Sequence, residues 1–291
     1  MRRLLLCPPD YYGIEYEINP WMRQTQNAEP ELARAQWKSL HDMLQSFGCQ
    51  VDLLAPQPGL PDLVFTANAG LVIGRRFILS NFRHKERRGE EVHFERWFAE
   101  HDFEVVKLPS KLMFEGEGDA LFCGDVLFCG YKYRSDIRSH HRLAEILGCL
   151  ALSVELVDER FYHLDTCFCP LPDGGAIWFP SAFDDYGQRV IRGRCAGLIE
   201  TAPEEAAQFA CNAAVLDREV VLRAALLSDA WKVKVSITWP NAIDPSSIWL
   251  RRELCRISSP MKNRQWSLSL RQRSAVSRRT TTFQPNFSSR I

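Results

Sequence analysis

Hydrophobic and polar positions along the first three quarters of the chain follow a pattern that repeats about every 50 residues. Each unit contains a helix with apolar residues at helical spacing, a short strand, a polar loop and a hairpin. The predicted helices cover residues 29–47, 89–101 and 135–148, and the strands after them begin near residues 51, 105 and 154. Turn residues predict hairpins at Gly74-Arg75, Gly124-Asp125 and 172–175, and a fourth unit begins at Gly197. The pattern predicts an α/β fold built from repeated units.

Polar side chains recur at one point of this repeat, directly after the central strand of each unit. They are Asn68, Glu115, Asp119, His163 and Asp165. Radial repetition of the units would bring them together around a pseudo-symmetry axis and form a pocket. Several carboxylates beside one histidine suit a flat cation with many N–H donors, which is a guanidinium group. Taken singly, each residue could equally form loop hydrogen bonds, and the acidic segment could be a tight turn.

The last quarter of the chain differs from the rest. Residues 223–291 hold 13 Lys and Arg against three acidic residues, a net charge of +10, whereas residues 1–222 have a net charge of −10. The pattern predicts a short helix at 223–229, a strand at 231–238 and then a long segment rich in Ser, Arg and Thr. We therefore expect a domain at 1–222 and a divergent, partly disordered basic tail at 223–291. A C-terminus that is read out of frame and a basic arm are the two alternative explanations.

Composition limits the class of protein. The sequence has no apolar run near the roughly 20 residues that span a bilayer, and its apolar start is too short for a signal peptide. We therefore expect a cytoplasmic protein with neither a membrane nor a nucleic acid as its partner. Several of the ten cysteines, among them Cys123 and Cys211, lie in apolar runs, which favours free thiols over disulfides. The spacing of Cys167 and Cys169 does not by itself indicate a metal site.

Three segments carry a resemblance to a known family. The segments 114–119 (FEGEGD), 161–168 (FYHLDTCF) and 65–70 (FTANAG) look like those of the pentein superfamily, which modifies guanidino groups. This superfamily includes arginine deiminase, dimethylarginine dimethylaminohydrolase and glycine amidinotransferase. The segments 18–22 (INPWM) and 84–90 (HKERRGE) are most similar to bacterial arginine dihydrolases of that superfamily. The resemblance extends from about residue 4 to residue 222.

The resemblance implies a fold, a reaction and a set of roles. The fold would be a five-bladed α/β propeller of ββαβ units, here with an incomplete final blade. The reaction would be hydrolysis of a guanidino C–N bond through a covalent cysteine intermediate, with no metal and no organic cofactor. His163 would be the general acid and base, Glu115 would orient it, and Asp165 would hold the guanidinium. The remaining substrate contacts would come from Asn19, Asn68, Arg87, Asp119 and Arg134.

Alternatives to hydrolysis stay open at this stage. An amidinotransferase would use the same site with an amine in place of water, and a non-catalytic protein would bind the guanidino compound without turnover. In each case the expected partner is a small arginine-like molecule, and the sequence also allows a homo-oligomer.

The nucleophile is the feature that the sequence lacks. The family carries its cysteine near the C-terminus in a glycine-rich loop, whereas this chain has no glycine after Gly197. Cys255 is the only cysteine of the tail, and the neighbouring Arg251, Arg252 and Arg256 would lower its pKa. Its setting lacks the glycines that let backbone approach a substrate, so we expect that Cys255 is not the nucleophile.

Overall fold

A computed structural model of the protein describes residues 2–26, 28–216, 219–226 and 229–236, with side chains up to residue 216. The chain divides into two units, Met1–Ser258 and Ser259–Ile291, and all described residues belong to the first. No helix within the described ranges is long and apolar enough to cross a membrane.

The described elements form a mixed α/β fold with five small sheets. In chain order they are β1 (Arg3–Leu6), α1 (Pro30–Ser46), β2 (Gln50–Leu53), β3 (Gly70–Ile73), β4 (Arg76–Leu79), α2 (Glu91–Glu100), β5 (Glu104–Lys107), β6 (Ala120–Cys123), β7 (Val126–Tyr131), α3 (Ile137–Leu147), β8 (Leu150–Glu155), β9 (Phe168–Pro170), β10 (Ala176–Trp178), α4 (Asp185–Arg194), β11 (Leu198–Glu200), α5 (Pro203–Ala206), β12 (Ala214–Leu216), β13 (Glu219–Leu226) and β14 (Asp229–Ser236). The predicted helices and hairpins of the repeat are confirmed to within a few residues.

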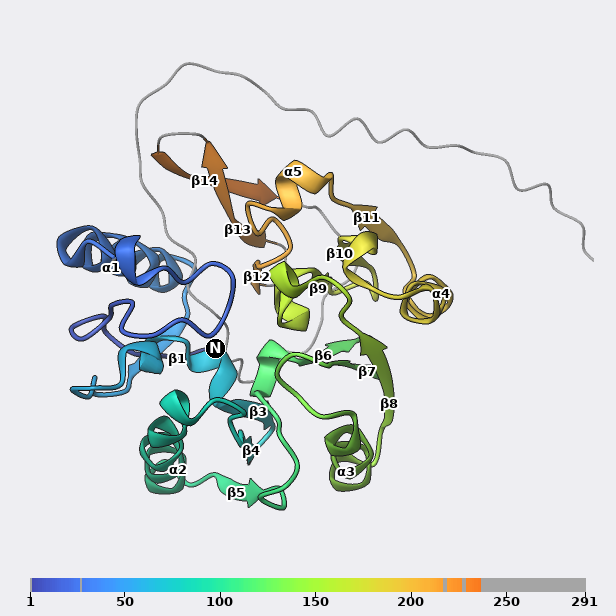
Figure 1. Ribbon diagram of the computed structural model, residues 1–291, viewed down its shortest axis with the longest axis horizontal. Coiled ribbons are helices and arrows are strands. Elements are labelled where there is room, and N and C mark those ends of the chain that lie inside the picture. The colour runs from blue at the N-terminus through green and yellow to red at the C-terminus, as the bar shows by residue number, and fades with distance from the viewer. Residues whose placement is uncertain (1, 27, 217–218, 227–228, 237–291) are drawn as a thin grey trace, which may run out of the picture. The chain divides into compact units, whose positions relative to one another are not determined.

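Three of the sheets share one topology. In the sheets β3–β4–β5, β6–β7–β8 and β9–β10–β11, an antiparallel hairpin is followed by a helix and by a third strand that pairs parallel to the second. Figure 1 shows α2, α3 and α4 each beside its own sheet, with β3, β6 and β9 nearer the middle of the unit than the helices are. The repeat that the sequence predicts is therefore present in the fold.

Local signals explain where the helices start and stop. The Asp136 side chain accepts a hydrogen bond from the Arg138 amide at the start of α3, and Gly148 ends that helix in the left-handed region with φ 62°. The buried face of α2 carries Phe94 and Phe98, which pack with Phe77 of β4. Each such buried aromatic side chain stabilises the fold by about 1.5–3 kcal/mol.

The fourth three-stranded sheet departs from this topology. Strand β14 pairs antiparallel to β13, whereas the third strand of each of the other three sheets follows a helix and pairs parallel to the second strand. The helix predicted at 223–229 is therefore wrong, because residues 223–226 belong to β13. Its Ala and Leu residues favour a helix locally, but pairing with β14 over the full length of β13 satisfies the backbone instead. Strand β13 also runs across residue 222, where the sequence predicts the domain boundary.

Among the described residues, the first sheet consists of β1 and β2, which pair parallel through the connection formed by α1. Leu4 and Leu6 of β1 share a hydrophobic core with Leu40 and Leu44 of α1 and with Leu216 of β12. The Arg2 guanidinium also donates to the Val215 carbonyl. The beginning of the chain therefore packs against the fourth repeat unit.

Candidate active site

Three short polar 3-10 turns form the centre of the candidate site. They are Thr66–Ala69, Gly116–Gly118 and Leu164–Thr166, and they directly or almost directly precede strands β3, β6 and β9. The first turn packs against the second, and the second against the third. Equivalent positions of three repeat units, which span about a hundred residues of sequence, therefore lie side by side.

Two glycines of the middle turn allow this close approach. Gly116 has φ +60°, and a Cβ there would lie 2.6 Å from the Gly70 nitrogen and 2.7 Å from the Ala67 carbonyl oxygen. A Cβ on Gly118 would meet the Asn68 amide nitrogen and would lie 3.1 Å from Nδ1 of His163. Any larger residue at either position would push the turns apart, so these glycines are required by the packing of the site.

His163 lies at the centre of the cluster and is fully buried. Its Nδ1 is 3.1 Å from Oδ1 of Asp119, and its Nε2 is 3.4 Å from Oε2 of Glu115. The amide nitrogen of Asn68 is also 3.4 Å from Nε2. Both ring nitrogens of His163 therefore face a carboxylate, and all three neighbours are buried as well.

Asp119 is held in place by groups of the protein. One carboxylate oxygen accepts the Ser135 hydroxyl at 2.6 Å, and the other accepts the Leu164 amide at 3.1 Å. The Ser135 hydroxyl oxygen in turn accepts the Glu115 amide at 3.0 Å. Since both oxygens of Asp119 have protein donors, Asp119 has little capacity left for a ligand.

Arg134 connects the cluster to the N-terminal segment. One terminal nitrogen of its guanidinium donates to Glu115 at 3.1 Å, and the other donates to the Ile18 carbonyl at 3.0 Å. The guanidinium also lies 4.7 Å from the centre of the Tyr162 ring. Arg134 is 2% exposed, so this ion pair is shielded from water.

Arg87 contacts the side-chain oxygen of Asn68, whereas His163 lies next to its side-chain nitrogen. It forms two parallel hydrogen bonds with the Glu90 carboxylate, at 2.8 and 2.7 Å, and donates to the Asn68 side-chain oxygen at 3.1 Å. The ring of Phe82 lies 4.4 Å from its guanidinium carbon. This bond to the Asn68 oxygen directs the Asn68 amide nitrogen toward His163. Arg87 therefore positions Asn68 within the cluster.

The acids of the cluster have shifted pKa values. Burial by itself would raise the pKa of Glu115, but the Arg134 guanidinium and His163 outweigh burial and lower it below the ordinary value. Burial raises the pKa of Asp119 to about 6, and it raises that of Glu90 to about 7 in spite of the Arg87 partner. Glu115 is thus the acid that stays ionised most readily beside His163.

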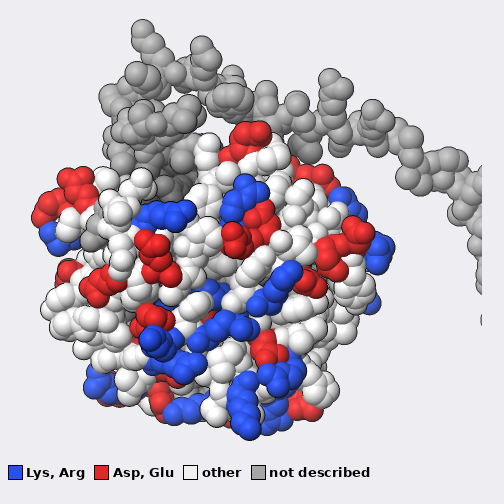
Figure 2. All heavy atoms as spheres, in the orientation of Figure 1, with Lys and Arg blue, Asp and Glu red and all other residues white. Residues whose placement is uncertain are grey.

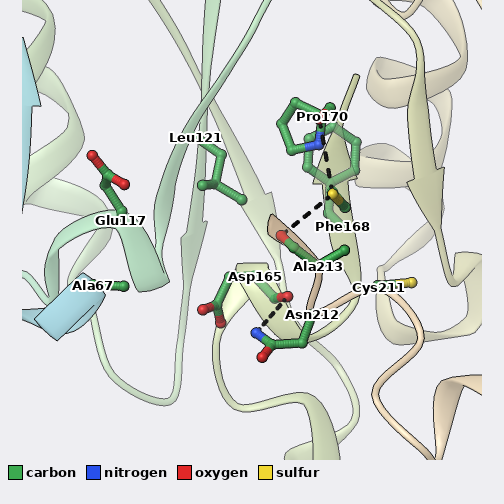
Figure 3. Close-up of a pocket in the computed structure, with 10 residues that line it drawn as sticks. Ala67, Glu117, Leu121, Asp165, Phe168, Pro170, Cys211, Asn212 and Ala213 are labelled. Atoms are coloured by element: carbon green, nitrogen blue, oxygen red, sulfur yellow. Dashed lines mark hydrogen bonds between the residues drawn. The ribbon is translucent and has the colours of Figure 1, made fainter. Parts of the chain in front are cut away.

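Asp165 lies two residues beyond His163 and lines an adjacent small pocket. The pocket has a volume of about 20 Å³, which is room for roughly one water molecule. Its lining comprises Ala67, Glu117, Leu121, Asp165, Phe168, Cys169, Pro170, Cys211, Asn212 and Ala213. Figure 3 shows the Asp165 carboxylate and the Asn212 amide pointing to the same side, toward Ala67. The Asn212 side chain donates to the Asp165 carbonyl at 3.1 Å.

Asn19 belongs to the segment that Arg134 holds. Its side-chain oxygen accepts the Trp21 amide at 2.9 Å, and the Trp21 indole nitrogen donates to the Arg160 carbonyl at 2.7 Å. The Trp21 ring lies edge-on to Phe209, with 4.9 Å between the ring centroids. Asn19 therefore directly follows the residue whose carbonyl Arg134 contacts, on a segment that is fixed to two other repeat units.

Negative charge dominates the interior around this site. Six buried carboxylates, Asp62, Glu90, Glu115, Glu117, Asp119 and Asp165, stand against two buried guanidiniums, Arg87 and Arg134, among the residues whose side chains are described. By contrast, Figure 2 shows Lys and Arg interspersed with Asp and Glu on the face of the molecule that it draws. An excess of buried carboxylates favours binding of a cation, because a positive ligand relieves their mutual repulsion.

The two cysteines that line the pocket are both buried. Cys169 and Cys211 line the pocket, but burial raises the pKa of the Cys211 thiol to about 12. Burial likewise raises the pKa of Cys167. Cys255 lies outside the described residues. Within the described ranges, no group of three or more His, Cys, Asp or Glu side chains could hold a metal ion.

The sequence pattern missed several residues of the cluster, above all Glu90, Ser135 and Asn212. Glu90 follows Arg87 by three positions, a spacing that usually marks an exposed ion pair on a helix. Only the burial of both side chains shows that this pair belongs to the site. The roles that the family resemblance suggests for the substrate-contacting residues stay predictions.

The pKa of Asp119 leads to a testable prediction. Its folded pKa of about 6 lies above the ordinary value of 3.8, so the folded state binds this proton more tightly than the unfolded state does. The contribution of Asp119 to stability therefore falls as the pH rises from about 4 to about 6. We expect Asp119→Asn to gain up to about 3 kcal/mol in unfolding free energy, relative to the wild type, between pH 4 and pH 7.

Urea denaturation of both proteins across this pH range measures the difference. Asp136→Asn is the control, since the hydrogen bond from Arg138 lowers the pKa of Asp136 and places its titration below pH 4. The difference in unfolding free energy between Asp136→Asn and the wild type should be constant between pH 4 and pH 7. A constant difference for Asp119→Asn would contradict the raised pKa.

Comparison with known proteins shows the family of the chain. Residues 9–234 match the family described as eukaryotic N,N dimethylarginine dimethylhydrolase. Over 239 residues the chain is 47% identical to the bifunctional arginine dihydrolase/ornithine cyclodeaminase ArgZ of a Synechocystis strain, which covers 80% of this chain but 34% of that protein. The chain thus spans about a third of the length of that curated relative.

Two further matches cover most of this chain and most of the chain to which it is aligned. The chain is 34% identical over 247 residues to an N(G),N(G)-dimethylarginine dimethylaminohydrolase of Mycobacterium tuberculosis, covering 85% of this chain and 81% of that protein. The crystal structure of the N-terminal domain of ArgZ, a cysteine-to-serine mutant bound to substrate, superposes with a TM-score of 0.74 at 46% identity, over 78% of this chain and 84% of that one. The chain belongs to the dimethylarginine dimethylaminohydrolase family, within the pentein superfamily of guanidino-modifying proteins.

Proposed function

We propose that this chain is a hydrolase that acts on the guanidino C–N bond of arginine or a close relative of arginine. The observation that carries the proposal is the buried cluster around His163, in which carboxylates outnumber guanidiniums six to two among the described side chains. Such an interior favours a cationic ligand, and a histidine inside it supplies proton transfer. The similarity to an arginine dihydrolase and to a dimethylarginine hydrolase supports the same substrate class.

The substrate guanidinium would bind beside Asp165. A carboxylate accepts two N–H donors of a guanidinium in parallel, and Asp165 is the carboxylate nearest in sequence to His163 that lines the pocket. Glu117 lines the same pocket and adds to its negative charge. Because the pocket has room for roughly one water molecule, its lining must open to admit the guanidinium.

His163 would act as the general acid and then as the general base. Nδ1 of His163 lies 3.1 Å from an Asp119 oxygen, and Nε2, which has Glu115 and Asn68 next to it, would be the atom that transfers the proton. A nucleophile adds to the guanidinium carbon, the C–N bond to the leaving amine breaks, and that amine takes the proton from His163. His163 then removes a proton from a water molecule that adds to the same carbon, and the bond between that carbon and the nucleophile breaks to release the product.

The other site residues would surround the substrate or position its neighbours. Asn19 and Arg134 lie on the side of the N-terminal segment, where the amino-acid end of arginine would bind. Asn68 would contact the guanidinium, and Arg87 would keep its amide in place. The contacts of Asp119 favour a positioning role over direct substrate contact.

We also infer that the five sheets are blades of an α/β propeller whose last blade is incomplete. The recurrence of the hairpin–helix–strand unit in three sheets supports this inference. The antiparallel β14, which takes the place of a helix and a parallel strand, supports an altered final blade. A cytoplasmic location, a homo-oligomer and the predicted tail at 223–291 stay predictions.

Calorimetry with arginine and an ammonia-release assay together test the proposed function. We expect the full-length protein to bind arginine and to release ammonia from it. Binding without turnover would indicate a non-catalytic guanidino-binding protein instead of a hydrolase. If arginine did not bind, the proposed binding site would be wrong. Turnover that is retained in Cys255→Ser would agree with our expectation for this residue, whereas turnover lost in that variant would identify Cys255 as the nucleophile.

A further inference from the structure

Two thiols outside the candidate site lie in direct contact. Cys123 is the last residue of β6, and Cys195 is the C-terminal capping residue of α4. Their sulfur atoms are 3.7 Å apart, although 71 residues separate them in sequence. The contact joins the sheet β6–β7–β8 to the helix that precedes β11.

The surroundings hold the two sulfurs together. The Cys123 sulfur lies 3.2 Å from the Gly174 carbonyl oxygen and 3.3 Å from that of Gly175, in the turn between β9 and β10. The Ala196 amide, directly after Cys195, donates to the same Gly174 carbonyl at 2.8 Å. Both thiols are therefore anchored to one turn, and neither needs a change of fold to reach the other.

Exposure and acidity differ between the two thiols in a way that suits disulfide exchange. Cys123 is buried, whereas Cys195 is half-buried and accessible from solvent. The contact with the Cys123 sulfur lowers the pKa of Cys195, which favours its thiolate form. The accessible cysteine is thus also the better nucleophile of the pair.

We propose that Cys123 and Cys195 form a reversible disulfide when the protein meets a low-molecular-weight disulfide such as oxidised glutathione. The Cys195 thiolate attacks one sulfur of glutathione disulfide, and one glutathione thiolate leaves. The Cys123 thiolate then attacks the Cys195 sulfur of the mixed disulfide, and the second glutathione leaves. The two cysteines together lose two protons and two electrons, and the two glutathione thiols take up both.

The geometry requires only a small adjustment. A disulfide bond is about 2.05 Å long, so the sulfurs must approach each other from 3.7 Å. The Cys123 sulfur would give up its contacts with the two glycine carbonyls in doing so. The inference does not depend on the proposed function.

Peptide mapping tests the proposal directly. The full-length protein is incubated with oxidised glutathione under native conditions, alkylated in denaturant without reductant, and digested with trypsin and with Glu-C under conditions where Glu-C cuts after Asp and Glu. These cuts place Cys123 in residues 120–125, apart from Cys129, and Cys195 in residues 195–200, apart from Cys211. We expect a linked pair of these two peptides that disappears after reduction.

Variants make the result specific. The linked pair should be absent from Cys195→Ser and unchanged in Cys149→Ser, which removes another half-buried thiol. Recovery of Cys195 only as a mixed disulfide with glutathione, or only as the alkylated thiol, would overturn the proposal. Because the wild-type map decides the question by itself, a variant that failed to fold would not obscure the answer.

Discussion

Replacing His163 with Ala is expected to slow the release of ammonia from arginine by about 10²–10⁴-fold, the usual contribution of a general acid and base. His163 is fully buried between Asp119 and Glu115, and it is the one histidine that contacts these acids among the described residues. Arginine binding should largely persist, because the carboxylates that attract the guanidinium remain. Steady-state ammonia release and calorimetry on the same preparation measure the two effects separately.

A second buried histidine provides the matched control. His140 is 3% exposed and contacts the Ser153 hydroxyl, outside the contacts of His163. His140→Ala should lower stability, but the folded fraction should retain turnover. Equal loss of activity in both variants would show that His163 contributes only to folding, and full activity in His163→Ala would contradict its catalytic role.

Replacing Asp165 with Asn should weaken arginine binding by about 30-fold or more. Removing one partner of a buried, hydrogen-bonded charge pair costs about 2–5 kcal/mol, and each 1.4 kcal/mol changes the affinity tenfold. The substitution keeps the size of the side chain and leaves the Asp165 backbone bond to Asn212 in place. Calorimetry in a His163→Ala background measures the affinity without turnover.

Glu117→Gln in the same background is the comparison, since Glu117 lines the same pocket. We expect it to weaken binding less than Asp165→Asn does, because it removes long-range attraction but no paired hydrogen bonds. A larger loss of affinity in Glu117→Gln than in Asp165→Asn would indicate that Glu117 forms the main contact with the guanidinium. Unchanged affinity for arginine in Asp165→Asn would show that Asp165 does not bind the guanidinium.

Much of the fold could be predicted because its signals are local. The turn at Gly124-Asp125 and the cap at Gly148 lie within a few residues of the structure that they determine. The helix predicted at 223–229 failed for the opposite reason. Residues 224–227 favour a helix in isolation, and only pairing with β14, which the local pattern cannot show, makes 223–226 a strand.

The site was predictable only in part, for a similar reason. The phase of the repeat and the family resemblance together identified Asn68, Glu115 and His163, which the structure brings into contact. Glu90 and Asp62 escaped notice because a buried carboxylate and an exposed one look the same in a sequence. Their place beside Arg87 depends on packing between segments that are distant along the chain.

Turnover of arginine in water labelled with heavy oxygen distinguishes hydrolysis from amidino transfer. If the protein hydrolyses the guanidino C–N bond, the oxygen of the water must appear in the ureido or urea product, and mass spectrometry of that product will show the label. The experiment should include an amine acceptor such as glycine, so that transfer competes with hydrolysis. Hydrolysis predicts that the ureido or urea product carries the label. An amidino group found on the amine, with no label in any product, would contradict it.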